Sequence, residues 1–187
     1  NIDTVVMSNT FDTMVEFMDS HPDAGISSCK LIYPDGGFQL SCRRYPTILS
    51  LFSNWQFISR KLPKYKFLNN IRSRYLMKDW DHSEIRVVDW VIAAFFVLRR
   101  ETTEMIGLLD ETFMPPMYVE DIEFCYRAKM YGWNTYYVPI TSIIHHYQRS
   151  SSKGLPNKMT LVHIVNLFRF FMKKWFMISS RSCGGKC

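Results

Sequence analysis

The residues best suited to chemistry are carboxylates and imidazoles in the second half of the chain. Glu120-Asp121 stands in an apolar stretch, Asp110-Glu111 comes ten residues earlier, and His145-His146 ends a predicted strand. A carboxylate can take a proton from a hydroxyl group, and imidazole is a common metal ligand. In an α/β fold such groups gather beyond the carboxyl ends of strands, where ligands bind. The alternative for Glu120-Asp121 is a charged first turn stabilised by its own helix dipole.

The two adjacent histidines cannot both face one site on a strand. Because neighbouring strand residues point to opposite faces, at most one of His145 and His146 is expected to be a ligand. A single histidine is more often structural than catalytic, and no nearby cysteine completes a zinc signature. Asp3 adds a carboxylate near the first residue, which by itself indicates little.

The elements that must position these residues follow from hydrophobic periodicity. The pattern predicts an α/β layered fold in which strands and helices alternate. Asn9 is expected to cap the first helix. The apolar run at 87–98 is typical of a strand buried on both faces, and Pro139 predicts an edge or a bulge. Helices are predicted at 9–20, 47–58, 101–108, 120–131 and 159–178, strands at 24–33, 38–42, 87–98 and 135–144, a solvated loop or irregular helix at 60–78, and a polar linker at 150–157.

Composition excludes several classes of protein. With 47% hydrophobic and 21% charged residues among 187, the chain is neither disordered nor of low complexity. Its longest apolar run, 90–98, is far shorter than the roughly 20 residues of a membrane-spanning helix. The five cysteines are odd in number and irregularly spaced, so they form neither a disulfide framework nor a zinc pattern. A reducing cytosol fits this cysteine usage.

Charge divides the chain at Glu123. Residues 1–123 hold 13 basic and 17 acidic side chains, whereas residues 124–187 hold 10 basic and none acidic. Two interpretations of the basic helix at 159–178 stay open. It is either a packing helix with a basic polar side or an interfacial helix on an anionic membrane, where each Lys or Arg contributes about 1 kcal/mol. Nucleic-acid binding is disfavoured because no helix-turn-helix, zinc-finger or RNA-binding signature accompanies the charge.

Two parts of the chain hold an ordered set of residues that is familiar as a whole. The first part of the set is Lys30-Leu31, Asp35-Gly36, Gln39, Ser41 and Arg43-Arg44-Tyr45-Pro46-Thr47. The second part is Val88-Asp89-Trp90-Val91, Arg99-Arg100, Ile106-Gly107, Leu109-Asp110-Glu111, Phe113, Glu120-Asp121, Cys125, Arg127, Gly132-Trp133, Tyr137, Pro139 and His145. This ordered set resembles the C-terminal half of inverting family-2 glycosyltransferases, and especially the bacterial rhamnosyltransferase and galactofuranosyltransferase-like enzymes. The resemblance implies a glycosyltransferase-A-like fold, a Rossmann-like mixed sheet flanked by helices, truncated at its N-terminus. Residues 1–150 would form the acceptor-side part of the catalytic domain, and residues 151–187 a linker, a basic amphipathic helix and a tail.

The resemblance also implies roles for individual residues. Asn1-Ile2-Asp3 occupies the place of the family's metal-binding Asp-x-Asp-type motif, so Asp3 would ligate Mg²⁺ or Mn²⁺ together with His145. Asp121 matches the general base, and Glu120 would help to hold the acceptor. The substrate-binding residues implied are Trp90, Asp89 and Arg127.

The activity implied is transfer of a sugar from a nucleotide-diphosphate sugar, with inversion, to a glycan or a polyprenyl-diphosphate-linked acceptor in cell-surface polysaccharide synthesis. The enzyme would be cytoplasmic and peripheral to the inner face of the plasma membrane, with an anionic membrane surface as partner and no nucleic acid. The alternative is a non-catalytic truncated fragment that binds only acceptor or membrane.

The chain departs from the family pattern in two places. Ile92-Ala93-Ala94 stands where the family has Ser/Thr-Gly-Ala, and the lost glycine predicts that the backbone approaches the acceptor pocket less closely. The loop at 114–117 is longer than usual, which predicts a shift of the base.

Overall fold

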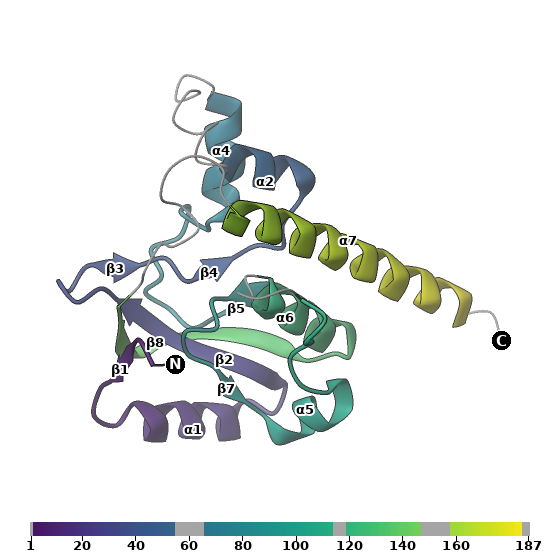
Figure 1. Ribbon diagram of the computed structural model, residues 1–187. Coiled ribbons are helices and arrows are strands. Elements are labelled where there is room, and N and C mark those ends of the chain that lie inside the picture. The colour runs from purple at the N-terminus through teal and green to yellow at the C-terminus, as the bar shows by residue number, and fades with distance from the viewer. Residues whose placement is uncertain (1, 55–65, 114–118, 147–157, 185–187) are drawn as a thin grey trace.

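A computed structural model describes residues 2–54, 66–113, 119–146 and 158–184. Its centre is a mixed sheet in which β2 (Ala24–Ile32) and β8 (Asn134–His145) run parallel to each other (Figure 1). Antiparallel strands flank this pair. β1 (Thr4–Val6) and β5 (Arg86–Val88) pair with β8, and β3 (Phe38–Gln39) and β7 (Val97–Leu98) pair with β2. A separate two-stranded ribbon joins β4 (Cys42–Arg43) to β6 (Trp90–Val91).

Helices cover both faces of the sheet, which places a hydrophobic core on each side. On one face α1 (Thr10–Ser20) packs its Met14, Phe17 and Met18 against apolar residues of β2 and β8. On the other face lie α5 (Arg100–Ile106) and α6 (Glu120–Met130), whose apolar side chains pack around Ile26. The mixed sheet between helical layers therefore has the α/β architecture that the sequence predicts.

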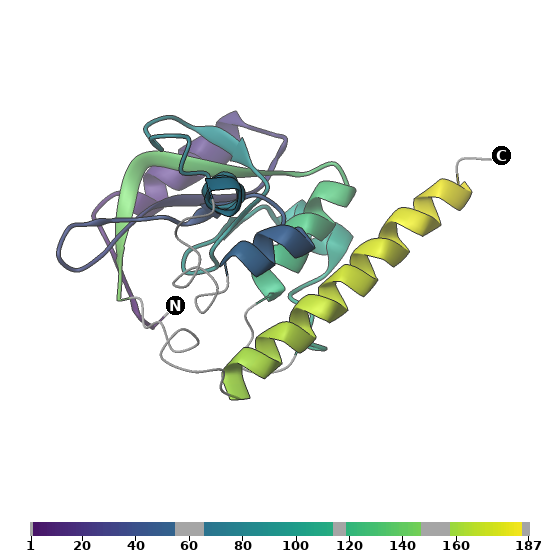
Figure 2. The same cartoon turned by 90° about the horizontal axis from the view of Figure 1, so that it is seen from above.

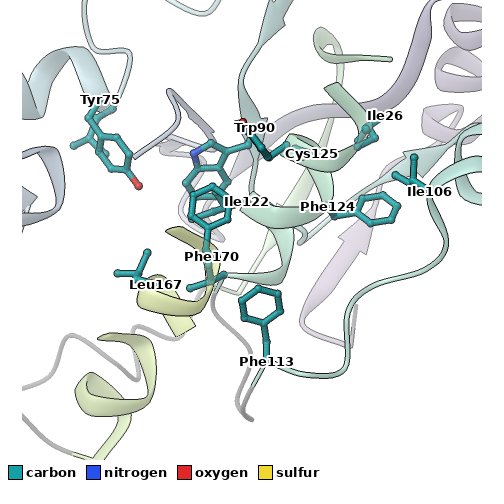
Figure 3. Close-up of a cluster of buried hydrophobic side chains, with 14 residues drawn as sticks. Ile26, Tyr75, Trp90, Ile106, Phe113, Ile122, Phe124, Cys125, Leu167 and Phe170 are labelled. Carbon is teal, nitrogen blue, oxygen red and sulfur yellow. The ribbon is translucent and has the colours of Figure 1, made fainter. Parts of the chain in front are cut away.

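A long helix, α7 (Lys158–Gly184), packs on the layer that contains α6. Its Phe170 is fully buried and makes an edge-to-face contact with Tyr126 of α6 at a ring-centroid distance of 5.8 Å. Figure 3 shows Phe170 with Leu167 in the cluster that also contains Ile122 and Trp90. The remaining helices, α2 (Ile48–Asn54) and α4 (Lys66–Tyr75), contact each other above this cluster (Figure 1). In the described part of the chain, no helix has the length and apolar character needed to cross a membrane.

Most of the predicted elements are confirmed. The helices expected at 9–20, 101–108, 120–131 and 159–178 correspond to α1, α5, α6 and α7, and the strands expected at 24–33 and 135–144 correspond to β2 and β8. Gly132 follows α6 with a φ of 92°, a left-handed conformation that ends a helix at little cost for glycine. The helix expected at 47–58 is α2 in its described part. Helix α4 replaces the solvated loop or irregular helix expected at 60–78.

The prediction of one continuous buried strand at 87–98 is wrong. The chain forms three short strands there, β5, β6 and β7, which pair with β8, β4 and β2 respectively. Val87 and Leu98 are exposed, so the run is not buried on both faces. The apolar character arises because successive parts of the segment pack in different places. An apolar run indicates burial but does not indicate a straight path.

Two further local predictions need correction. The strand expected at 38–42 divides between β3 and β4, which belong to different sheets. Asn9 lies at the N-cap position of α1 in a left-handed conformation, but its side chain makes no capping hydrogen bond. The linker expected at 150–157, the division expected after residue 150 and the loop at 114–117 lie outside the described residues.

Pro139 lies in a bulge and not at an edge. β8 has β2 on one side and β1 and β5 on the other, so it is an internal strand. Cys29 of β2 pairs with Val138, yet the next residue, Lys30, pairs with Ser142. Residues 139–141 are thus unpaired with β2, and a proline is tolerated there because it has no N–H to contribute to the ladder.

The packing of α7 predicts a contrast between two neighbouring phenylalanines. Phe170→Ala removes a fully buried ring and is expected to lower the free energy of unfolding by about 3–5 kcal/mol. Phe168→Ala removes a ring that is 66% exposed, so its effect is expected to stay within about 0.5 kcal/mol. Urea denaturation of the two variants measures both changes. Equal destabilisation by the two substitutions would contradict this placement of α7.

Candidate active site

The start of the chain and the end of β8 bring Asp3 and His145 together. β1 pairs with β8 so that Thr4 lies opposite His145, and the backbone N–H of His146 donates to the Asp3 carbonyl at 2.8 Å. The Nε2 atom of His145 then lies 3.4 Å from Oδ2 of Asp3. His145 is buried whereas His146 is exposed, as strand alternation predicts. The antiparallel pairing therefore places two residues 142 positions apart in the sequence at one point.

Gln39 of β3 holds the other side of the His145 ring. Its Oε1 lies 2.6 Å from Nδ1 of His145, and its side chain is buried. With the Gln39 amide oxygen as the acceptor, Nδ1 of His145 donates this hydrogen bond and Nε2 faces Asp3. Burial lowers the pKa of His145, although the negative charge of Asp3 and a hydrogen bond with Asp3 act in the opposite direction. The neutral ring is the form that binds metals.

Asp3 offers atoms that fit a divalent cation. Its Oδ1 is buried and, among the described residues, has no hydrogen-bond partner. Two carboxylate oxygens and one imidazole nitrogen are donors that suit Mn²⁺ and, for the oxygens, Mg²⁺. The described residues contain no group of three or more His, Cys, Asp or Glu side chains placed to hold a metal. Cations bound through one or two carboxylates usually take their other ligands from water and substrate phosphates.

Asp121 forms a second polar centre at the N-terminus of α6. Asp121 is only 9% exposed, and its carboxylate accepts a hydrogen bond from the backbone N–H of Ile122 at 2.8 Å. Burial raises the pKa of Asp121 to about 8, and the negative charge of Glu120 adds to the rise. The backbone amides of Ile122 and Ala93 and the positive charge of Arg43 act in the opposite direction. Such a carboxyl group changes its protonation state close to neutral pH, which suits a general base.

Ala93 lies close to Asp121, because its backbone amide lowers the pKa of that carboxyl group. That alanine in place of glycine at 93 makes the backbone approach the acceptor pocket less closely stays a prediction.

Glu120 points away from Asp121, toward the preceding residue. Its Oε2 accepts from the backbone N–H of Val119 at 2.9 Å, and burial raises its pKa. Glu120 therefore satisfies a backbone donor just before the helix, as expected of a charged first turn. Asp110, which the sequence places with the same acidic group, instead pairs with Lys173 of α7 and accepts from Thr112.

Trp90 and Asp89, predicted to bind substrate, both hold the chain at 44–45. The Trp90 indole N–H donates to the Arg44 carbonyl at 2.9 Å, and Asp89 Oδ2 accepts from the Tyr45 N–H at 2.8 Å. The Trp90 ring is buried in the cluster that also contains Tyr75 (Figure 3). Their contact with substrate stays a prediction, and their observed contacts position the segment that leads into α2.

Arg127, the third residue predicted to bind substrate, ties α6 to the end of α5. Its Nε and one terminal nitrogen hold Glu123 at 3.0 and 2.9 Å, and its two terminal nitrogens also donate to the carbonyls of Ile106 and Leu108. It lies six residues after Asp121, about 9 Å farther along the helix axis. Arg127 therefore has structural contacts, and its role toward substrate stays a prediction.

One short segment connects the two polar centres. Gln39 contacts His145, and four residues later the positive charge of Arg43 acts on Asp121. Arg43 is fixed beside Trp90 by the pairing of β4 with β6. The sequence singles out Gln39 and Arg43 only through their resemblance to the family pattern. No local signal shows which side chains they approach, because both approaches depend on pairing between distant strands.

The chain is similar to rhamnosyltransferases. No protein-family model matches it. An N-acetylglucosaminyl-diphospho-decaprenol L-rhamnosyltransferase of Mycobacterium tuberculosis (strain ATCC 25618 / H37Rv) is 24% identical over 154 residues, which cover 82% of this chain and 48% of that protein. Rhamnosyltransferase WbbL of Escherichia coli (strain K12) is 23% identical over 177 residues, which cover 93% of this chain and 60% of that protein. The chain thus spans about half the length of the curated relatives that it matches. Its mixed sheet flanked by helices fits a glycosyltransferase-like fold.

The raised pKa of Asp121 predicts how stability depends on pH. The native state keeps the proton up to about pH 8, whereas an unfolded aspartate releases it near pH 4. The contribution of this group to stability is therefore present below pH 4 and is lost as the pH rises to 8, by up to about 1.4 kcal/mol per pH unit. Glu120, whose pKa is also raised, changes stability in the same direction.

Asp121→Asn keeps a neutral side chain at every pH and is expected to remove most of this slope. Urea denaturation at pH 5.5 and 8.5 measures the free energy of unfolding of each protein. The matched control is Asp12→Asn, which changes an exposed aspartate in the first turn of α1 and should leave the slope intact. An unchanged slope in Asp121→Asn would show that Asp121 is ionised in the native protein.

Proposed function

We propose that this chain carries the acceptor-side part of a metal-dependent, inverting glycosyltransferase of family 2 with a glycosyltransferase-A fold. The enzyme transfers a hexosyl or rhamnosyl group from a nucleotide-diphosphate sugar to a glycan or a polyprenyl-diphosphate-linked acceptor in cell-surface polysaccharide synthesis. The observation that carries the proposal is the meeting of Asp3 with His145: Oδ2 of Asp3 lies 3.4 Å from Nε2 of His145, and Oδ1 of the same carboxylate is buried without a partner among the described residues. The names of the relatives support rhamnosyl transfer and a polyprenyl-diphosphate acceptor.

Asp3 and His145 would hold Mg²⁺ or Mn²⁺, with Gln39 fixing the ring of His145. A cation at this place neutralises the negative charge that develops on the departing nucleoside diphosphate. The hydrogen bond that a metal-binding histidine donates to a neighbour of this kind orients the ring and is needed for full affinity. The geometry of the Gln39 contact supports this arrangement.

Asp121 acts as the general base. Its carboxylate takes the proton of the acceptor hydroxyl group while the acceptor oxygen bonds to the anomeric carbon and the bond from that carbon to the diphosphate breaks. Attack opposite the leaving group inverts the configuration, and one base suffices because no covalent intermediate forms. Burial and the amide of Ala93 hold the carboxylate in place, and Glu120 helps to hold the acceptor. Trp90, Asp89 and Arg127 complete the proposed substrate-binding set.

The proposed enzyme works in the cytoplasm at the inner face of the plasma membrane, because polyprenyl-linked acceptors reside in membranes. Its partners are the sugar nucleotide, the acceptor and an anionic membrane surface, and nucleic acid is not among them. Cys29, Cys42 and Cys125 are free and buried, which is compatible with a reducing compartment.

The metal site predicts coupled binding of Mn²⁺ and a nucleoside diphosphate. Calorimetric titration should show that UDP or dTDP binds more tightly with Mn²⁺ than without it. His145→Ala should abolish this coupling, and Gln39→Ala should weaken Mn²⁺ binding by about 10- to 100-fold because the ring loses its hydrogen-bond partner. His146→Ala, which changes the exposed neighbour, is the matched control and should bind like the wild type. Equal loss of coupled binding in His145→Ala and His146→Ala would argue against a metal site at His145.

The assignment of Asp121 as the general base predicts that its substitution slows sugar transfer without weakening donor binding. In the full-length natural protein, Asp121→Asn should lower sugar transfer by about 10² to 10⁴-fold. The assay uses nucleotide-activated L-rhamnose and a polyprenyl-diphosphate-linked N-acetylglucosamine acceptor, and donor affinity should stay unchanged. Asp12→Asn should transfer at the wild-type rate. Transfer that survives in Asp121→Asn would refute the assignment of the base, and an inactive wild type would favour the non-catalytic binding module.

A further inference from the structure

The outward face of α7 is apolar from Leu161 to Ile178. Between Thr160 and Ser179, the most exposed side chains are all hydrophobic. Figure 2 shows α7 as the outermost element on its side of the molecule. The exposed residues are Leu161, Ile164, Phe168, Met172, Trp175, Phe176 and Ile178.

Their spacing places these residues on one side of the helix. Leu161, Phe168 and Trp175 repeat every seven residues, and Ile164 and Ile178 lie beside them at intervals of three and four. The buried residues Asn166 and Phe170 lie on the opposite side and pack on the protein. Helix α7 therefore has two apolar faces, of which the inner one packs on α6 and its neighbours and the outer one is exposed.

Three basic residues in the middle of α7 lie outside its outward face. Arg169 donates to the Thr112 carbonyl, and Lys173 pairs with Asp110. Lys174 lies over the rings of Tyr45 and Tyr126, at 5.9 and 5.2 Å from their centroids. The basic side chains that the sequence suggested for contact with an anionic surface thus sit at the flanks of α7 and also serve its attachment to the protein.

We infer that the outward face of α7 docks into the interfacial layer of a bilayer that contains anionic lipid, with Phe168, Trp175 and Phe176 entering the acyl boundary. The inference rests on the proposed function for the presence of a membrane. The docking surface and the way in which it inserts are inferred from the exposed residues of α7. Aromatic residues on one face of an otherwise basic helix are typical of interfacial helices. The charges at the flanks lie where lipid phosphates would meet them.

Charge distinguishes this partner from a second copy of the chain. Helix α7 carries five basic residues and no acidic one: Lys158, Arg169, Lys173, Lys174 and Arg181. Two copies packed through this face would bring like charges together with no acidic residue on either helix to form the ion pairs that stabilise paired helices. Anionic headgroups complement the same charges. The electrostatics therefore favour a lipid surface over a homodimer.

Insertion of apolar side chains predicts binding that resists salt. In flotation assays the chain should bind vesicles of phosphatidylcholine with phosphatidylglycerol and retain most of its binding in about 0.5 M NaCl, where charges on the surface are strongly screened. Phe168→Ser/Trp175→Ser should weaken binding at least about 10-fold. The matched control is Phe11→Ser. Phe11 is 59% exposed on α1 at the other face of the sheet, so this substitution should leave vesicle binding unchanged.

Three results would overturn the inference. They are absent binding by the wild type, wild-type binding by Phe168→Ser/Trp175→Ser, and a dimer in light scattering that this double substitution dissociates. The substitutions are outside the proposed catalytic centre, so Mn²⁺ and nucleotide titration of the double variant should match the wild type. Flotation that persists in a protein without transferase activity would leave docking intact while refuting the proposed function.

Discussion

The parallel pairing of β2 with β8 is the interaction on which the rest of the structure depends. The two strands are separated by about a hundred residues of chain, and their alignment determines where every other element lies. β1, β5, β3 and β7 attach to one of the two, and α1 and α6 cover opposite faces. The pairing also brings His145, the last residue of β8, level with the end of β2, where Gln39 and Asp3 approach it. The bulge at Pro139 adjusts the register before this point without releasing the pair.

The sequence predicts elements well where periodicity is local and predicts contacts poorly where they depend on strand pairing. Helix α6 and strand β8 follow from apolar spacing and from Gly132. The division of the segment 87–98 into three strands does not follow from the sequence, because packing against three different partners produces the same apolar run as a single buried strand. The meeting of Asp3 with His145 could be anticipated only from the resemblance to a family. The contact of Gln39 with His145 crosses β2 and has no local signal.

The candidate site combines two centres that differ in how their charge is controlled. At His145 the Gln39 amide oxygen contacts one ring nitrogen and the Asp3 carboxylate lies near the other, so hydrogen bonding determines how the ring is oriented. At Asp121 burial dominates, and the backbone donors offset only part of its effect on the pKa. The segment from Gln39 to Arg43 connects the centres, since its first residue contacts one and its last acts electrostatically on the other. A displacement of this segment would therefore change both centres together.

Helix α7 links the outer surface of the molecule to the layer that positions Asp121. Phe170 packs against Tyr126 of α6 and belongs to the same cluster as Ile122, the residue that follows Asp121. Lys174 on the same helix lies over Tyr45, whose backbone N–H is held by Asp89. The rings of Phe170 and Tyr126 therefore connect α7 to the helix that carries Asp121. A bilayer contact on α7 would for this reason influence how the candidate site is oriented relative to the membrane.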